Sequence, residues 1–163
     1  MSSSQKSQPQ LFAHHLPLIT IFCDGACSGN PGAGGWAAMV EFDGERHEYS
    51  GGARHTTNNQ MELQALIEAL KNSPRERPLK IVTDSEYLAK GVTQWMKTWI
   101  KNGWLTAAKK PVKNRDQWSE INLLLLGRQY SFEWVKGHSG HEENERCDEL
   151  ARGEIAKLRS RGL

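Results

Sequence analysis

Short apolar runs alternate with helical patterns along most of the chain. Residues 18–23 form an apolar, β-branched run that predicts a buried strand. A turn rich in Gly, Asn and Pro follows, and the apolar pattern resumes at 34–40, so the two runs predict a hairpin. Residues 45–50 are polar enough for an edge strand, which we expect to end at Gly51 and Gly52.

A helical pattern follows this strand. Apolar residues at helical spacing predict a helix that begins near Thr57 or Asn58, either of which can cap it: Leu63, Leu66, Ile67 and Leu70. After a loop, residues 79–83 predict another strand. A strand, a helix and a strand in succession favour a right-handed crossover to a parallel neighbour.

The second half of the chain predicts four helices and one strand. A short helix begins at Ser85 and is expected to break at Gly91. The remaining elements are expected as helices at 93–101 and 115–126, a strand at 130–135 and a terminal helix from Glu142 to about Arg159.

Composition places this pattern in one globular domain. The chain has 163 residues and a net charge of +2, and we expect a disordered leader at 1–16 followed by a single domain at 17–160. No apolar run approaches the roughly 18 residues of a membrane span. Three cysteines without zinc-like spacing favour a reducing compartment, and hence the cytoplasm.

Four carboxylates are predicted to face the interior of the protein. Asp24 and Asp84 each follow an apolar strand, and if these strands are parallel neighbours the two residues lie about 5 Å apart. Glu62 and Asp148 share helix faces with apolar residues. Four such charges repel one another unless cations neutralise them, and an all-oxygen set suits Mg²⁺.

Each carboxylate also has a purely structural interpretation. Asp24 could be a turn residue, Glu62 could interact with the helix dipole, and Asp148 could belong to a salt bridge on its helix. His138, between glycines, could move a proton or assist product departure, although a solvated loop histidine fits its position as well.

A basic stretch with interleaved tryptophans is the second chemical feature. From Tyr87 to Arg115 the chain has seven basic residues and no acidic one. Lysines beside aromatic rings suit a nucleic-acid backbone whose sugars pack on the ring faces. The alternative is a solvated basic face above buried tryptophans, and we expect at least two of the four to be buried: Trp95, Trp99, Trp104 and Trp118.

Five motifs, in order, resemble those of a type I ribonuclease H of the compact bacterial kind. They are DGACSGNPG at 24–32, TTNNQME at 56–62, TDS at 83–85, WVKGHSGH at 134–141 and ENERCDELA at 143–151. The resemblance covers about residues 17–151. It implies an α/β ribonuclease H-like fold with a mixed five-stranded sheet, order 3-2-1-4-5, and helices on both faces.

The resemblance also implies an activity, namely endonucleolytic hydrolysis of the RNA strand of RNA/DNA hybrids, leaving 5′-phosphate and 3′-hydroxyl ends. Two Mg²⁺ ions, or Mn²⁺ in their place, would be bridged by Asp24. Glu62 and Asp84 would complete one metal site and Asp148 the other, and His138 would assist turnover. The implied partner is the RNA/DNA hybrid duplex. The protein is expected to be a monomer that does not associate with a membrane.

Substrate contacts are implied by the same comparison. Minor-groove contacts are implied for Cys27, Asn30, Asn58 and Asn59, and a DNA-phosphate pocket for Thr57 and Asn114. A basic protrusion that holds the DNA strand is implied for Trp95, Lys97, Trp99, Lys101, Lys109 and Lys110.

Four positions depart from the family pattern. Glu86 stands where glutamine is usual, Gln60 and His55 where arginine is common, and Glu142 where proline is usual. Two other functions fit the same residues less well. One is a nuclease of the same superfold that acts on DNA, and the other is a module that binds hybrids without cutting them.

Overall fold

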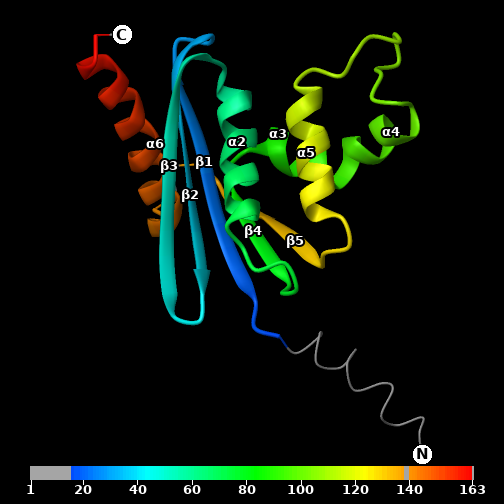
Figure 1. Cartoon of the computed structure of the whole chain (residues 1–163), viewed down its shortest axis with the longest axis horizontal. Coiled ribbons are helices and arrows are strands. Elements are labelled where there is room, and N and C mark those ends of the chain that lie inside the picture. The colour runs from blue at the N-terminus through cyan, green and yellow to red at the C-terminus, as the bar shows by residue number, and fades with distance from the viewer. Residues whose placement is uncertain (1–15, 138–139, 163) are drawn as a thin grey trace, which may run out of the picture.

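The computed structural model describes residues 16–137 and 140–162. Within them, five strands form one sheet in the order β3-β2-β1-β4-β5, which confirms the predicted order (Figure 1). The strands are β1 (Ile19–Ser28), β2 (Gly32–Phe42), β3 (Glu45–Thr56), β4 (Leu79–Thr83) and β5 (Tyr130–Trp134). The helices are α2 (Asn58–Lys71), α3 (Glu86–Lys90), α4 (Met96–Lys101), α5 (Arg115–Leu125) and α6 (Glu142–Ser160), and a π-helical turn, η1 (Gly91–Trp95), joins α3 to α4.

The sheet is mixed because its two halves have different pairing. β1, β2 and β3 form an antiparallel meander. β4 pairs in parallel with β1, as the predicted crossover requires, and β5 pairs in parallel with β4. β1 is therefore the central strand, with an antiparallel neighbour on one side and a parallel neighbour on the other.

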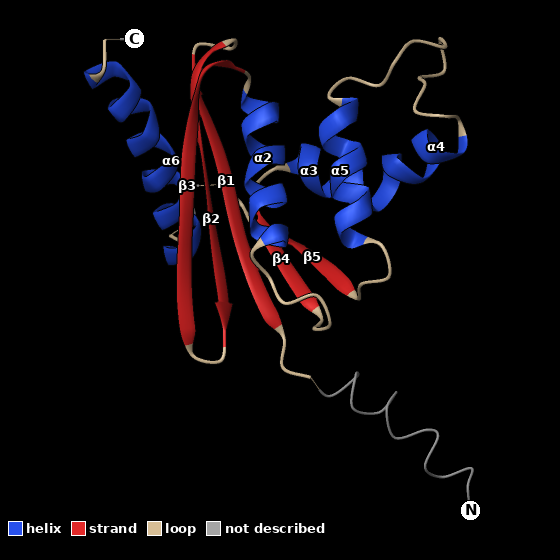
Figure 2. Cartoon of the chain, viewed as in Figure 1, coloured by secondary structure: helices blue, strands red, loops and turns tan. Residues whose placement is uncertain are grey.

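Helices cover both faces of the sheet, as predicted. Figure 2 shows α6 on one side of β1–β3 and the remaining helices on the other. Side chains of β1 alternate accordingly: Ile21 and Cys23 pack toward α2, whereas Phe22 packs toward Cys147 and Ala151 of α6.

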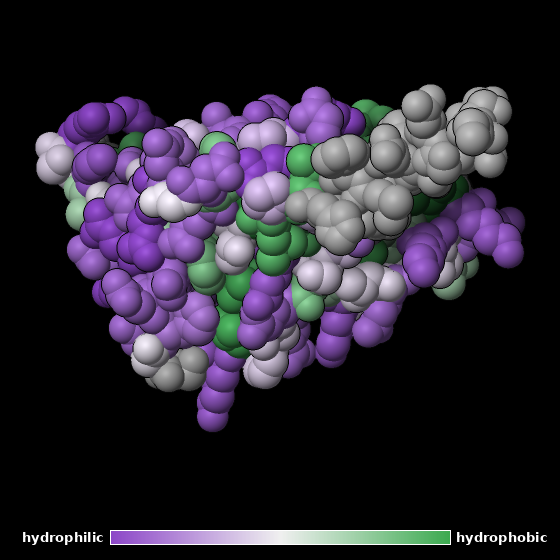
Figure 3. All heavy atoms as spheres, turned by 90° about the horizontal axis from the view of Figure 1, so that it is seen from below, coloured by the Kyte–Doolittle hydropathy of each residue, from purple (hydrophilic) through white to green (hydrophobic). Residues whose placement is uncertain are grey.

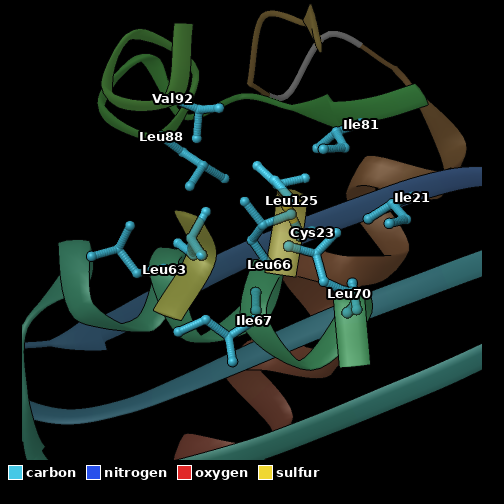
Figure 4. Close-up of a cluster of buried hydrophobic side chains, with 14 of the residues drawn as sticks. Ile21, Cys23, Leu63, Leu66, Ile67, Leu70, Ile81, Leu88, Val92 and Leu125 are labelled. Atoms are coloured by element: carbon cyan, nitrogen blue, oxygen red, sulfur yellow. The ribbon is translucent and has the colours of Figure 1, made fainter. Parts of the chain in front are cut away.

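The larger apolar cluster lies between the sheet and α2. Figure 4 shows Leu63, Leu66, Ile67 and Leu70 of α2 beside Ile21 and other core side chains. The four α2 residues are at most 2% exposed. The apolar positions that predict this helix from the sequence are therefore the ones that α2 buries.

The expectation that Gly51 and Gly52 end the third strand is wrong. β3 continues to Thr56, and Gly51 pairs with Trp36 of β2. A Cβ at Gly51 would lie 2.7 Å from Nε1 of Trp36. Glycine is thus kept within the strand because the indole ring occupies the space of a side chain.

The expected break at Gly91 is also wrong. The chain stays helical from α3 through η1 to α4, and Gly91 begins the π-helical turn. A Cβ at Gly91 would lie 2.0 Å from the Trp118 ring, whose side chain is fully buried. The glycine therefore serves close helix packing instead of ending the helix.

The face at the end where β1 begins is largely polar (Figure 3). Viewed from the end where β1 begins, the coloured residues in Figure 3 are mostly hydrophilic, with hydrophobic atoms in a narrow band. No helix within the described part of the chain is long and apolar enough to cross a membrane. Residues 1–15 of the expected leader lie outside the described residues, so the leader and the domain bounds remain predictions.

Candidate active site

Asp24 lies at the point where the parallel pairing of β1 ends. The last paired residues are Phe22 and Val82, and continuing this register by two positions places Asp24 opposite Asp84. The prediction that β1 ends at Asp24 is wrong, because β1 runs on to Ser28 beside β2. It is β4 that ends, and Asp24, which is 7% exposed, is buried beside that end.

Glu62 reaches the same place from the second turn of α2. A Cβ at Gly25 would lie 2.5 Å from the backbone nitrogen of Glu62, so the helix can approach β1 only because residue 25 has no side chain. Thr57 caps α2 and forms a capping box with Gln60, in which Oγ1 of Thr57 accepts a 3.2 Å hydrogen bond from the Gln60 amide. The cap fixes where the helix begins and hence where Glu62 lies.

Two neighbours hold the Glu62 carboxylate. Nδ2 of Asn58 donates to Oε1 at 3.0 Å, and Oγ of Ser85 donates to Oε2 at 2.5 Å. Ser85 also caps α3, since its Oγ accepts from the amide of Leu88 at 3.0 Å. Ser85, the residue after Asp84, therefore links the start of α3 to α2. Its place in the sequence motif did not reveal this role.

The end of β5 and the segment after it lie against Asp84. Nε1 of Trp134 donates to the Asp84 carbonyl at 3.0 Å. A Cβ at Gly137 would lie 3.1 Å from Oδ2 of Asp84, so this glycine brings the backbone close to the carboxylate. His138, the next residue, lies outside the described residues, and its predicted role is untested.

Asp148 projects from α6 toward the same region. Its helix face also carries Ala151 and Ile155, both buried, as the sequence pattern predicts. The Asp148 side chain is 21% exposed and forms an ion pair with Arg152, Nη2 to Oδ2, at 2.9 Å. The salt bridge that the sequence analysis gave as an alternative for Asp148 is therefore present, and its predicted role as a metal ligand stays a prediction.

The four carboxylates influence one another through their charges. Burial, reinforced by the charges of Asp84, Asp148 and Glu62, raises the pKa of Asp24 to about 9. Burial also raises the pKa of Glu62 to about 7, against the lowering effect of the hydrogen bond from Ser85. A cation placed among these groups would relieve both desolvation and repulsion.

The four carboxylates supply the donor atoms that a hard divalent cation prefers, but their side chains are not arranged around a common point. Among residues 16–137 and 140–162, no three Asp, Glu, His or Cys side chains are arranged to hold a metal ion. Two of the four carboxylates have other partners, because Glu62 accepts from Ser85 and Asp148 pairs with Arg152. All four nevertheless supply only oxygen, the donor type that Mg²⁺ prefers.

The predicted minor-groove residues gather beside this site. Oδ1 of Asn30, in the β1–β2 turn, accepts from the amide of Asn58 at 3.1 Å. Sγ of Cys27 donates to the carbonyl of Thr56 at 3.3 Å. The β1–β2 turn and the start of α2 are thus joined, and Asn59 follows on the same first turn of α2.

Asn114 lines an open cavity of about 650 Å³ near the start of α2. Its Oδ1 accepts from Nε2 of Gln60 at 3.3 Å, and its Nδ2 donates to the hydroxyl of Tyr87 at 3.1 Å. Thr57 does not line the cavity but caps the helix that carries Gln60. The lining residues are Thr56, Gln60, Met61, Pro111, Asn114, Arg115, Asp116 and Gln117. The sequence did not indicate Arg115 or Gln117 as part of this cavity.

The tryptophans of the basic segment form a connected cluster of tilted rings. Trp118 is fully buried, whereas Trp95, Trp99 and Trp104 are half-buried. The Trp99 ring centroid lies 5.9 Å from that of Trp95 and 5.4 Å from that of Trp118. The expectation that at least two of the four are buried is therefore wrong, because only Trp118 is buried and the other three keep part of their surface exposed.

The lysines around this tryptophan cluster are exposed. Lys97 and Lys101 lie on α4, and Lys109 and Lys110 lie on the loop that follows it. Within the described part of the chain, none of the four forms an ion pair. The positive charge of this segment is therefore available to a polyanion.

The sheet order and the carboxylates at the end of its parallel pair define an α/β protein of ribonuclease H-like fold. A family model described as RNase H matches residues 17–156. The Ribonuclease H of Bradyrhizobium diazoefficiens is 52% identical over 144 residues, which cover 88% of this chain and 94% of that protein. The chain therefore belongs to the RNase H family.

Solved structures agree with this assignment. LC9-RNase H1, described as a type 1 RNase H with the type 2 active-site motif, superposes with a TM-score of 0.77 at 30% identity, covering 87% of this chain and 74% of that one. LC11-RNase H1 in complex with an RNA/DNA hybrid has a TM-score of 0.64 at 26% identity, covering 86% of this chain and 98% of that one.

Proposed function

We propose that this protein is an endonuclease that hydrolyses the RNA strand of RNA/DNA hybrids, leaving 5′-phosphate and 3′-hydroxyl ends. The single observation that carries the proposal is the burial of Asp24 within reach of the charges of Asp84, Asp148 and Glu62. Membership of the RNase H family supports the reaction, and the hybrid bound to LC11-RNase H1 supports the substrate.

Divalent cations are part of this proposal. Asp24 would bridge two Mg²⁺ ions, with Glu62 and Asp84 completing one site and Asp148 the other, and Mn²⁺ would substitute. When bound, such ions stabilise the attacking and leaving oxygens of a phosphodiester. The buried and mutually repelling carboxylates support cation binding, because a divalent charge would offset what burial and repulsion cost.

The chain's own groups would orient and protect this site. Ser85 and Asn58 hold the Glu62 carboxylate by its two oxygens, so that it cannot rotate freely. Gly137 brings the backbone over Asp84. His138, the next residue, would move a proton or help the product leave.

The substrate would lie across the site and along the basic segment. Small polar groups beside Glu62 would contact the minor groove: Cys27, Asn30, Asn58 and Asn59. Thr57 and Asn114 would contact a DNA phosphate at the cavity near the start of α2. The DNA strand would continue over the exposed basic and aromatic residues, namely Trp95, Lys97, Trp99, Lys101, Lys109 and Lys110.

We further propose that the protein acts as a monomer in the cytoplasm. The cysteines support a reducing compartment, because Cys23, Cys27 and Cys147 are all free thiols. Size-exclusion chromatography with light scattering should give the mass of one chain, and elution as a dimer would contradict this part of the proposal.

Cleavage of a labelled hybrid tests the proposal directly. The same sequence is compared as RNA/DNA, RNA/RNA, DNA/DNA and single-stranded RNA, with Mg²⁺ or with EDTA, using the wild type and Asp24→Asn. We expect metal-dependent cutting of RNA in the hybrid alone, reduced by at least about 100-fold in the variant. Wild-type rates in the variant would refute the metal assignment. Preferred cutting of DNA/DNA would indicate a DNA nuclease, and binding without cutting would indicate a binding module.

A further inference from the structure

The Asp148 carboxylate is held by a cation of its own helix. Within the described residues, it is the only one of the four site carboxylates that forms an ion pair. Arg152 lies one turn further along α6, and its Nε donates a 2.9 Å hydrogen bond to Oδ2 of Asp148. Nη2 lies 2.9 Å from the same oxygen. Both contacts therefore use one oxygen of the carboxylate.

The two partners differ in their access to solvent. The Asp148 side chain is 21% exposed, whereas the Arg152 side chain is 66% exposed. The guanidinium thus reaches the carboxylate from the solvent side, and it can return to water when another cation takes its place at Asp148. A pair with one largely exposed partner is weak enough for a divalent ion to displace.

Asp148 also lies beside the strand that carries Asp24. Its neighbours on α6, Cys147 and Ala151, pack against Phe22 of β1. A divalent ion bound by Asp24 and Asp148 would therefore compete with Arg152 for the same carboxylate. Arg152 neutralises the Asp148 charge when no ion is bound. Breaking the Arg152–Asp148 ion pair then costs free energy when the ion binds.

We propose that Arg152 is a positioning residue that holds Asp148 in the metal-free protein and weakens divalent-cation binding at the Asp24–Asp148 site. The inference rests on the proposed function, because it requires Asp148 to be a metal ligand. It follows that this site should bind a divalent cation more weakly while Arg152 is paired with Asp148.

A matched pair on the same helix separates this role from ordinary helix stabilisation. Nζ of Lys157 lies 3.0 Å from Oε1 of Glu154, and the Lys157 side chain is 61% exposed. Lys157→Ala therefore removes a cation of similar exposure and pairing from α6, but not from the carboxylate site. Arg152→Lys keeps the charge beside Asp148, and Asp148→Asn removes the proposed ligand.

The experiment is a calorimetric Mn²⁺ titration of the full chain without nucleic acid. We expect Arg152→Ala to bind Mn²⁺ about three- to tenfold more tightly than the wild type at the weaker site, because one positive charge next to a ligand is removed. Arg152→Lys should stay near the wild type, and Lys157→Ala should change affinity less than twofold.

Two results would overturn the inference in distinguishable ways. If Arg152→Ala binds Mn²⁺ no more tightly than Lys157→Ala while Asp148→Asn loses the weaker site, Asp148 is a ligand but Arg152 does not hold it back. If Asp148→Asn binds Mn²⁺ like the wild type, the ligand assignment fails, and the inference about Arg152 fails with it.

Discussion

Asp24 places an ionisable carboxyl group in a strand whose immediately preceding residues are buried and apolar. It follows Cys23, which is 1% exposed, and it is itself 7% exposed. Packing alone does not favour a carboxyl group at such a position, because burial disfavours the ionised form. The residue is thus a local cost to folding in the absence of a cation, and this cost depends on pH.

Asp24→Asn should stabilise the metal-free protein at alkaline pH. Burial and the charges of Asp84, Asp148 and Glu62 raise the pKa of Asp24 to about 9. Between the ordinary carboxyl range and that value, the folded state binds more protons than the unfolded state, so stability falls as pH rises. Urea unfolding in EDTA should show the variant more stable at pH 8 by roughly 1–4 kcal/mol, with a smaller gain at pH 4.5.

Adding Mg²⁺ supplies the control for this prediction. The ion should stabilise the wild type more than the variant, because the variant lacks the charge that the ion neutralises. A stability difference that is the same at both pH values would contradict the assigned cause. The asparagine would then act through packing instead of charge.

The residue types of the site could be predicted from the sequence, whereas their partners could not. Strand ends and helix faces indicated the four carboxylates, because strand and helix periodicities determine which side chains point inward. No periodicity reveals that Ser85 donates to Glu62 or that Tyr87 accepts from Asn114. Such contacts depend on how separate elements dock.

At the scale of elements, the two wrong predictions about Gly51 and Gly91 have the same cause, because contacts between separate elements cannot be predicted from periodicity. The sequence predicted the helix and strand types correctly, yet it treated Gly51 and Gly91 as ends. Each glycine instead lies under a tryptophan, Trp36 and Trp118 respectively. Glycine ends an element through its backbone freedom but allows close packing through its missing side chain, and only the neighbour distinguishes the two.

Gly91→Ala should therefore destabilise the protein, although alanine favours helices. A Cβ would lie 2.0 Å from Cη2 of Trp118, a ring that is fully buried and cannot swing away. We expect a loss of about 1–3 kcal/mol in the free energy of unfolding, measured by urea denaturation, because overpacking outweighs the gain in helix propensity.

Gly153→Ala is the matched control within a helix. Gly153 lies inside α6, and a Cβ there would meet nothing within 4 Å. Only helix propensity then changes, so we expect a gain of about 0.5–1 kcal/mol. If Gly91→Ala also stabilised the protein, the close approach of Trp118 would not be what selects glycine at position 91.

At the scale of the whole molecule, the sheet separates two kinds of surface. α6 and α4 lie at opposite ends of the fold in Figure 1. α6 begins with Glu142, Glu143 and Glu145 in its first turn, whereas α4 and the loop after it carry exposed lysines. A net charge of +2 hides this asymmetry, and the asymmetry would orient a polyanion before any specific contact forms.

The double variant Lys97→Ala/Lys101→Ala tests whether that surface binds the substrate. Both side chains are exposed on α4, at positions four residues apart, and they therefore share one face. If each neutralises one phosphate, the slope of log K against log salt should become less steep by about two, and hybrid affinity at low salt should fall. Fluorescence anisotropy of a labelled hybrid in Ca²⁺ or EDTA measures binding without turnover.

A charge-matched variant distinguishes a contact from a change in net charge. Lys71→Ala/Lys157→Ala also removes two lysines, but these lie at the end of α2 and on α6 and pair with Glu120 and Glu154. We expect its salt slope to stay that of the wild type, because long-range effects of charge are screened over about 10 Å at 0.1 M salt. Equal slopes for the two double variants would mean that α4 contributes only general positive charge, and the hybrid would then have to leave the active site along another face.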